Sequence, residues 1–342
     1  MRTATLPGPV LAATGQDTMQ AIVQRRYGTV PEDLFRLERI AKPAAGPGEV
    51  LVRVRAAGVD RGTWHLMTGL PYLARVVGFG LRAPKFPVPG WAVAGTVEAV
   101  GAGATGLRPG DEVFGTCRGS FAEYVATRAS RLAPKPAGLT FEQAAALPIS
   151  ATTALQALRD TAKLQPGQRV LVIGASGGVG TFAVQIAKAL GAEVTGACST
   201  AKTDLVRAVG AGHVIDYTRE DPAAGDRRYD VVIDIGGDRR PAHLRRALAP
   251  HGTLVLTGGE GGRWLGPIGR NIRAQLLSVF VSQRLTAFLA RERRADLVTV
   301  GDLAASGAIT PAIDRAYPLS QAAAALGHLA GGRARGKVVI SI

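Results

Sequence analysis

The chain has 342 residues, long enough for two domains that each bury their own apolar core. Hydrophobic residues make up 46% of it, which excludes a largely disordered protein. The formal net charge of +15 comes from 41 basic residues, of which only seven are lysine, and the arginines are dispersed along the chain. We therefore expect no nucleic acid partner, and we expect denser groups such as residues 291–294 to be solvated helix faces.

The cysteine content and the pattern of apolar residues indicate the cellular compartment of the protein. Cys117 and Cys198 are too few for a disulfide framework, which is typical of a reducing cytoplasm. No apolar run reaches the ~18 residues of a membrane span, so we expect no stable membrane insertion. Residues 1–18 lack a signal-peptide pattern. We predict that they form a disordered tail of a cytoplasmic protein.

Short strands and turns follow this tail. Residues 48–55 alternate apolar and polar side chains with period two and predict a strand. Further strands are expected at 94–101 and 119–125, and residues 108–115 are expected to form a turn that leads into a strand. This series predicts a mostly antiparallel, barrel-like domain in the first part of the chain.

The segment from Leu70 to Val88 is an apolar insertion within that domain. Arg75, Arg82 and Lys85 are interspersed among its apolar residues. We interpret the segment as a substrate lid. An interfacial helix that touches a membrane or a hydrophobic quinone pool is the alternative.

Residues 170–180 read Val-Leu-Val-Ile-Gly-Ala-Ser-Gly-Gly-Val-Gly and predict a strand, a glycine turn and a helix start. Glycines let backbone N–H groups approach phosphates, and a helix N-terminus adds unpaired donors and a positive dipole end. A purely structural tight turn is the alternative. The motif favours a dinucleotide pyrophosphate site that consists of Gly174, Ser176, Gly177, Gly178, Val179 and Gly180.

The residues after the next strand indicate which dinucleotide is bound. We expect this strand at 193–198, and it does not end in the carboxylate with which NAD-specific folds bind the adenine ribose. Ser199, Thr200 and Lys202 follow instead, and hydroxyls with a cation suit a 2′-phosphate. We therefore predict NADPH. In the alternative interpretation, Ser199 and Thr200 only cap the next helix.

Three more apolar runs, at 214–217, 229–237 and 252–259, continue the pattern of a parallel sheet. Ligands of open parallel sheets lie at the carboxyl ends of the strands. The glycines that end the last two runs should therefore face the cofactor, although tight turns alone would also explain them. These glycines are Gly236, Gly237, Gly258 and Gly259.

The order of these motifs resembles the medium-chain dehydrogenase/reductase superfamily, and within it the zinc-free quinone oxidoreductase branch that includes zeta-crystallin. The resemblance rests on the glycine turn together with Pro-Gly-Asp-Glu-Val-Phe-Gly at 109–115, Phe-Ala-Glu-Tyr-Val at 121–125, Ala-Ala-Ala-Leu-Pro at 144–148 and Arg-Gly-Lys at 335–337. It implies an α/β protein with a GroES-like β-barrel catalytic domain and a Rossmann doubly wound parallel-sheet domain. The implied ranges are 19–147 for the catalytic domain, 148–296 for the NADPH-binding domain and 297–342 for a C-terminal segment that returns to the first domain.

The resemblance also assigns roles to single residues. It places Thr153 against the nicotinamide, Tyr217 near the adenosine phosphate and Lys337 among the cofactor-binding residues. It implies a homodimer, in which residues 276–281 are the edge strand that pairs the subunits.

Zinc-dependent members of the superfamily hold the metal with two cysteines and a His-Glu pair. Matching motif to motif puts Asp60 at the first cysteine, Trp91 and Ala92 at the His-Glu pair, and Ile149 or a neighbour at the second cysteine. Zinc needs three or four nitrogen, sulfur or oxygen donors in a tetrahedral array, and these residues do not supply them. We therefore expect no metal at this position.

Quinone oxidoreductases line their substrate pocket with an asparagine and two tyrosines, and Asp60, His65 and Tyr72 match those positions here. We predict that Tyr72 donates a proton or hydrogen bond and that His65 is its partner. An ionised Asp60 cannot donate. It would orient His65 or Arg61, bind the nicotinamide ribose, or carry a raised pKa.

Without a Lewis acid, an alkoxide developing on a simple ketone lacks a stabiliser, whereas a conjugated acceptor delocalises its charge. We therefore predict a zinc-independent, NADPH-dependent oxidoreductase whose small-molecule substrates are quinones or α,β-unsaturated carbonyl compounds. An NAD(P)-dependent alcohol dehydrogenase or ketone reductase is one alternative. A non-catalytic NADPH-binding sensor is another, and the aspartate at position 60 favours it.

Overall fold

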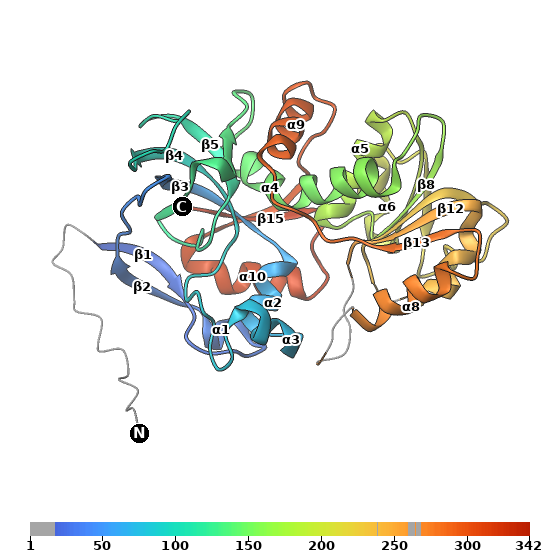
Figure 1. Ribbon diagram of the computed structural model, residues 1–342, viewed down its shortest axis with the longest axis horizontal. Coiled ribbons are helices and arrows are strands. Elements are labelled where there is room, and N and C mark those ends of the chain that lie inside the picture. The colour runs from blue at the N-terminus through green and yellow to red at the C-terminus, as the bar shows by residue number, and fades with distance from the viewer. Residues whose placement is uncertain (1–17, 238, 259–263, 265–267) are drawn as a thin grey trace.

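The computed structural model describes residues 18–237, 239–258, 264 and 268–342. A mostly antiparallel sheet and a parallel sheet lie side by side, and helix α4 (Phe141–Gln156) runs between them (Figure 1). The structure confirms the predicted fold class, a GroES-like domain joined to a Rossmann-like parallel sheet.

The first sheet has the order β14-β15-β3-β4-β5-β7, with β6 paired to β3, while β1 and β2 form a separate pair. Its core strand β3 buries Val50, Val52 and Val54 on one face. The early strands are β1 (Thr18–Val23), β2 (Arg36–Ala41), β3 (Glu49–Val59), β4 (Ala92–Val100), β5 (Glu112–Thr116), β6 (Tyr124–Arg128) and β7 (Leu132–Pro134). The early helices are α1 (Pro31–Leu34), α2 (Arg61–Thr68), α3 (Tyr72–Ala74), the π-helical turn η1 (Arg75–Phe79) and the 3₁₀ turn η2 (Ala129–Arg131).

Two expected boundaries in this part need correction. Thr18, predicted to end a disordered tail, is the first residue of β1 and pairs with Ala41. Residues 1–17 lie outside the described residues. The strand predicted at 119–125 begins only at Tyr124, because the preceding turn follows Gly119 at positive φ and residue 122 makes only an isolated bridge to Ala21.

The parallel sheet has the order β10-β9-β8-β11-β12-β13, and every strand pair in it is parallel. The strand order reverses between β8 and β11, which is where ligands bind in doubly wound sheets. Its strands are β8 (Arg169–Ile173), β9 (Glu193–Cys198), β10 (His213–Asp216), β11 (Tyr229–Asp234), β12 (Leu248–Leu256) and β13 (Arg284–Ala287). Its helices and turns are α5 (Gly178–Ala189), η4 (Thr200–Lys202), α6 (Thr203–Ala208), α7 (Pro241–Leu244), η5 (Arg245–Ala247) and α8 (Ile268–Ser278).

The edge strand is not where the sequence placed it. Residues 276–278 end helix α8, and the N–H groups of Val279 and Phe280 continue its turn by bonding to residues 276 and 277. The edge strand is β13, beginning at Arg284. A short apolar run suits a helix end as well as a strand, so periodicity alone does not separate the two.

Helix α4 belongs to both halves of the molecule. Thr140 and Gln143 form a capping box at its start, and nearly all side chains from Ala144 onward are buried. The helix packs against β3, β4 and β5 on one side and against α5 on the other. The domain boundary predicted at 147/148 therefore falls inside one continuous helix.

The C-terminal segment returns to the first sheet, where β15 pairs antiparallel with β3. Its elements are α9 (Arg294–Ala305), β14 (Ile313–Pro318), η6 (Leu319–Gln321), α10 (Ala322–Ala330) and β15 (Lys337–Ser341). Among the described residues, no helix is both long and apolar enough to cross a bilayer.

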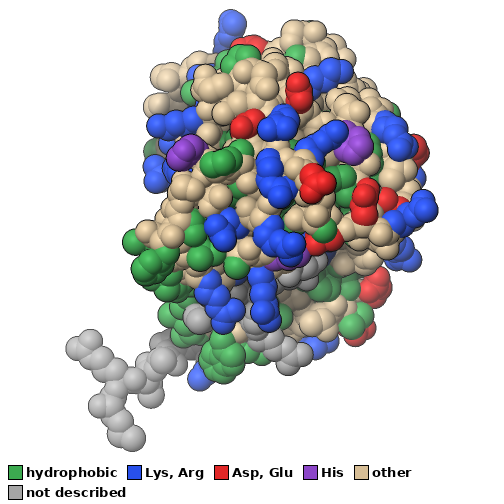
Figure 2. Space-filling model, turned by 90° about the vertical axis from the view of Figure 1, so that its right-hand side faces the viewer, with side chains coloured by type: hydrophobic (Ala, Val, Ile, Leu, Met, Phe, Trp, Pro, Cys, Tyr) green, Lys and Arg blue, Asp and Glu red, His purple; other side chains and the backbone are tan. Residues whose placement is uncertain are grey.

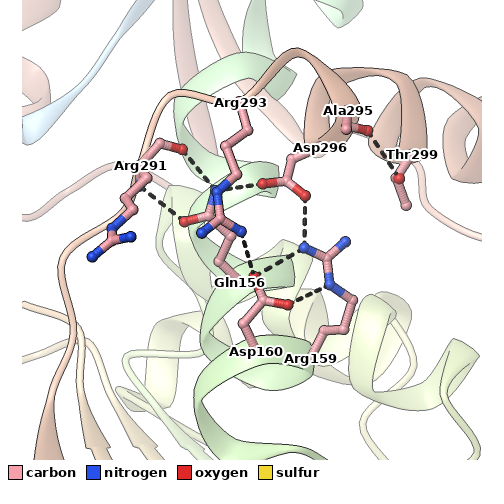
Figure 3. A network of polar contacts seen from close by, with 8 residues as sticks. All are labelled: Gln156, Arg159, Asp160, Arg291, Arg293, Ala295, Asp296 and Thr299. Atoms are coloured by element: carbon pink, nitrogen blue, oxygen red, sulfur yellow. Dashed lines mark hydrogen bonds and ion pairs between the residues drawn. The ribbon is translucent and has the colours of Figure 1, made fainter.

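A polar network fixes the point where the chain leaves the parallel sheet (Figure 3). Asp296 is only 2% exposed and accepts hydrogen bonds from Gln156 and Arg159, each at 2.6 Å. Arg159 and Arg293 both pair with Asp160 on η3 (Ala157–Ala162). Residues 291–294 are all exposed, as expected, but residues 291–293 precede α9, so the expectation that they form a helix face is wrong.

Candidate functional site

The glycine turn forms an anion site at the start of α5. Gly174 has φ +84°, and a Cβ on Gly180 would collide with the Gly174 carbonyl, so both positions require glycine. The first backbone bond of the helix runs from Thr181 to Gly177 at 2.9 Å. The N–H groups of residues 178–180 precede that bond and lie at the positive end of the helix dipole. The turn thus fits a dinucleotide pyrophosphate.

The loops after β11 and β12 close around the same end of the sheet. A Cβ on Gly174 would lie 3.2 Å from the backbone nitrogen of Gly236, and a Cβ on Gly258 would lie 2.5 Å from the carbonyl of Ile235. Gly236, Gly237 and Gly258 therefore lie just beyond the strand ends, and their contact with the cofactor stays a prediction. Gly259 is outside the described residues.

A buried ion pair, which the sequence reasoning missed, fixes these two loops. Asp234 ends β11 at 1% exposure and accepts a short hydrogen bond from Arg270 on α8. Arg270 also donates to the carbonyls of Gly258 at 3.1 Å and Arg239 at 3.0 Å. Burial raises the pKa of Asp234, although the positive charge of Arg270 opposes that shift. The available signal was a carboxylate at the end of an otherwise apolar strand.

The turn after β9 carries the residues predicted to bind a 2′-phosphate. Lys202 Nζ donates to the carbonyls of Gly332 and Ala334, both at 2.7 Å, so two of its three N–H donors hold the C-terminal segment. Thr200 Oγ1 donates to Asp216 at 2.5 Å. Ser199 precedes η4 and makes no side-chain cap. The capping alternative is therefore wrong for Ser199, whose hydroxyl is left for another partner.

Asp216 puts a carboxylate beside this turn from the neighbouring strand. It ends β10 in register with Cys198, the last residue of β9. Hydrogen bonds from the Thr200 and Thr218 hydroxyls lower the pKa of Asp216, so it is ionised at neutral pH. The residues at the end of β9 do not reveal this charge in the sequence, because it comes from the neighbouring strand.

Tyr217 follows Asp216 and is 42% exposed. The guanidinium of Arg239 lies 5.6 Å from its ring centroid, and Arg239 Nε lies 3.9 Å from Asp221. Arg239 thus puts a cation beside the ring of Tyr217. On the face of the molecule formed by the parallel-sheet domain, basic side chains are spread out with acidic side chains between them (Figure 2).

Lys337, Asp60 and Ser150 meet in the seam between the two sheets. Lys337 is 2% exposed, and its Nζ donates a short hydrogen bond to Asp60 Oδ1 and longer ones to Ser150 Oγ at 3.1 Å and Val59 O at 3.4 Å. All three ammonium donors are thus directed at protein oxygens. A Cβ on Gly178 would lie 2.8 Å from Lys337 Cδ, so the glycine turn rests directly on this side chain.

This cluster occupies the position matched to zinc in the sequence. Asp60 corresponds to the first cysteine, and Ser150 follows Ile149, which was matched to the second. Trp91 directly precedes β4. In the described part of the chain, no three His, Cys, Asp or Glu side chains are grouped to hold a metal ion. The residues here suit a fixed ammonium better than Zn²⁺.

Asp60 contacts partners that the sequence reasoning did not consider. Its Oδ1 is directed at Lys337 and Ser150, whereas its buried Oδ2 has no hydrogen-bond partner among the described residues. The backbone N–H of Gly336 also donates to Ser176 O at 2.8 Å. The C-terminal segment therefore joins the catalytic sheet to the cofactor turn.

His65 lies on α2, which begins directly after Asp60, and Tyr72 begins the next helix, α3. His65 Nδ1 is 3.1 Å from the carbonyl of Leu70. The ring of Tyr72 packs edge-on against Trp264 at 5.2 Å and lies 4.8 Å from the guanidinium of Arg75. These contacts of His65 and Tyr72 thus lead to different partners. The hydroxyl of Thr153 donates to Ile149 O at 2.6 Å within α4.

A cavity of about 230 Å³ lies between α2, the 70–88 segment and the start of β4. Phe79 and Trp91 meet edge to face at 6.4 Å, and the guanidinium of Arg118 stacks on Phe86 at 4.5 Å. Leu73 N bonds to Trp264 O at 3.2 Å, so the 70–88 segment touches the loop after β12. The residues that line the cavity include Leu66, Phe79, Phe86, Val88, Trp91 and Arg118.

Comparison with known proteins identifies the family. An alcohol dehydrogenase GroES-like domain matches residues 46–137, and a zinc-binding dehydrogenase domain matches residues 209–340. A quinone oxidoreductase of Rattus norvegicus is 32% identical over 324 residues, which cover 92% of this chain and 94% of that protein. The chain belongs to the medium-chain dehydrogenase/reductase superfamily.

Two further relatives place this superfamily member among quinone oxidoreductases and similar reductases. A 2-methylene-furan-3-one reductase of Solanum lycopersicum is 32% identical, with coverage of 94% of this chain and 79% of that protein. The structure of a quinone oxidoreductase from Coxiella burnetii superposes with a TM-score of 0.84 at 27% identity, covering 95% and 99% of the two chains. The protein is thus an oxidoreductase of this superfamily, which uses nicotinamide cofactors.

Proposed function

We propose that this protein is a zinc-independent, NADPH-dependent oxidoreductase that reduces quinones or α,β-unsaturated carbonyl compounds. The observation that carries the proposal is the buried Lys337–Asp60 ion pair, completed by Ser150, at the position matched to zinc. Because an ammonium stands here and its three N–H donors are already used, this cluster offers a simple ketone neither a metal-type Lewis acid nor a free hydrogen-bond donor. A conjugated acceptor needs less stabilisation from the protein, since it spreads the developing negative charge over several atoms.

The bound nicotinamide supplies a hydride, and the side chains around it bind, orient and protonate. The N–H groups at the start of α5 hold the pyrophosphate, and the ion pair fixes the glycine turn against the catalytic sheet. We assign the phenol of Tyr72 as the donor to the acceptor oxygen, with His65 as its partner. Asp60 faces an ammonium and therefore serves as an acceptor rather than as an acid.

The preference for NADPH is part of the proposal. Lys202 keeps one N–H donor, Ser199 keeps its hydroxyl, and Arg239 adds a cation beside Tyr217. Against these stands the carboxylate of Asp216, which two threonine hydroxyls hold in place. Charge-assisted bonds to a phosphate monoester are strong enough to favour NADPH in this setting.

The test compares acceptors and metals in one assay. Protein dialysed against a chelator is given NADPH or NADH with an enone and with the matching saturated ketone. We expect full activity without added metal, faster reduction of the enone, and faster reaction with NADPH. Preference for the saturated ketone, or activity that only added Zn²⁺ restores, contradicts the proposal and favours an alcohol dehydrogenase. Binding of NADPH with no turnover of any acceptor favours a sensor.

We also propose a cytoplasmic homodimer that pairs through the end of the parallel sheet. Strand β13 ends the sheet order, and beside it Leu276, Val279 and Phe280 are 61%, 78% and 83% exposed. A patch of this kind is typical of an interface between copies. Light scattering should give twice the chain mass for the wild type and the monomer mass for Phe280→Asp. A wild-type monomer would end this part of the proposal.

A further inference from the structure

The cavity between α2 and the 70–88 segment has aromatic rings and one arginine in its lining. Phe79, Phe86 and Trp91 contribute rings, and Leu66 and Val88 contribute apolar surface. A volume of about 230 Å³ is below the 300–1,000 Å³ of common ligand pockets, which suits a small planar molecule rather than a long chain. Flat aromatic walls favour a flat, conjugated ligand.

Arg118 supplies the charged end. Its guanidinium stacks on Phe86, which fixes the plane of the group while its N–H donors stay free for a ligand. The side chain is exposed, and its one described interaction is this stacking. Lys85 Nζ lies 5.8 Å from the same ring, and Lys85 N donates to Phe79 O at 2.7 Å. Two cations therefore flank Phe86.

No acidic residue lies close to Lys85 in the sequence. Residues 61–97 contain four basic residues, Arg61, Arg75, Arg82 and Lys85, and neither aspartate nor glutamate. Within the described ranges, Arg118 and Lys85 make no ion pair. An aromatic cavity with an uncompensated guanidinium at one end is complementary to a planar acid.

We propose that the acceptor reduced at this site is a planar conjugated molecule that carries a carboxylate or sulfonate, and that Arg118 binds this anionic group. The inference rests on the proposed function, because it takes the cavity to be the acceptor site. The ring of the acceptor lies against Phe79 and Trp91. Arg118 therefore determines substrate specificity and takes no part in hydride transfer.

The decisive experiment measures KM for two acceptors that differ only in charge. The probes are 1,4-naphthoquinone and its 2-sulfonate, assayed with saturating NADPH at low ionic strength. We expect a lower KM for the sulfonate with the wild-type protein. Arg118→Gln should raise the ratio of the sulfonate KM to the neutral KM by about fivefold to tenfold, and added salt should shrink this effect.

Arg82→Gln is the matched control, since it removes the same charge from another exposed position without removing a residue that lines the cavity. We expect its KM ratio to equal that of the wild type. An equal rise of the KM ratio in both variants would show that the overall positive charge of the surface attracts the sulfonate, and it would overturn the proposal. An unchanged ratio in Arg118→Gln would overturn it as well.

A binding measurement separates this inference from the proposed function. Calorimetry with 2-naphthalenesulfonate, which cannot be reduced as a quinone can, should show about tenfold weaker binding to Arg118→Gln than to the wild type. If neither quinone is reduced but this difference is seen, the cavity is an acid-binding site and the proposed function fails. If neutral quinones are reduced, but the sulfonate has no lower KM and its KM does not change in Arg118→Gln, only the present inference fails.

Discussion

Replacing Lys337 by methionine tests the ion pair that joins the two sheets. Methionine fills most of the same volume but leaves the carboxylate of Asp60 buried without its counter-ion. The two side chains are only 2% and 9% exposed, so solvent screens the pair weakly. Removing one partner of such a pair costs about 3–5 kcal/mol. At an unfolding entropy of ~2.1 cal/mol/K per residue, that loss lowers the Tm of the whole chain by about 4–7 °C.

Calorimetry of the cofactor-free protein at pH 7 measures this shift. Asp60→Asn/Lys337→Met removes both charges, and we expect it to recover most of the loss, because no unpaired charge stays buried. Lys188→Met, at an exposed position of α5, is the matched control and should stay within about 1 °C of the wild type. A Tm of Lys337→Met within 1 °C of the wild type, or a double variant less stable than the single one, refutes the reasoning.

Three other predictions concern the cofactor turn, the thiols and the network around Asp296. In binding titrations, Lys202→Ala should reduce the affinity for NADPH about fivefold more than the affinity for NADH, because only NADPH carries the 2′-phosphate. Equal losses of affinity would show that Lys202 does not bind this phosphate. Burial raises the pKa of Cys117 to about 12 and also raises the pKa of Cys198. A thiol reagent at pH 8 should therefore label neither cysteine in the native protein and both after unfolding. Fast labelling of the native protein would contradict the burial of these thiols. The hydrogen bond from Arg159 holds the pKa of Asp160 below its ordinary value of ~3.9, so its contribution to stability is present above that pH and is lost as the pH falls through the lowered pKa. The stability gap between wild type and Asp160→Asn in urea unfolding should therefore narrow below about pH 4, and a constant gap from pH 7 to pH 3 would refute this assignment.

The sequence was most informative where chemistry requires a local pattern. The strand predicted at 193–198 is β9 with the same limits, and the glycine turn has the backbone that its motif requires. Gly180 illustrates the reason. The carbonyl oxygen of Gly174 lies too close for any side chain at position 180, so the position requires a glycine that can be recognised in the sequence.

Contacts between distant segments could not be predicted in the same way. Asp60 and Lys337 are 277 residues apart, and nothing in their local sequence indicates that β15 pairs with β3 and brings them together. Asp216 escaped notice for the same reason, since strand register places it beside Cys198. The run at 276–281 failed for a different reason, because a short apolar stretch fits a helix end as well as an edge strand.

The most direct test of the central claim follows the hydride itself. The metal-depleted protein is given an enone and NADPH that carries deuterium at both C4 positions, and the product is analysed by mass spectrometry and NMR. We predict a saturated ketone with one deuterium at the β-carbon and a solvent-derived hydrogen at the α-carbon. Deuterium at the carbonyl carbon of an allylic alcohol would contradict the account.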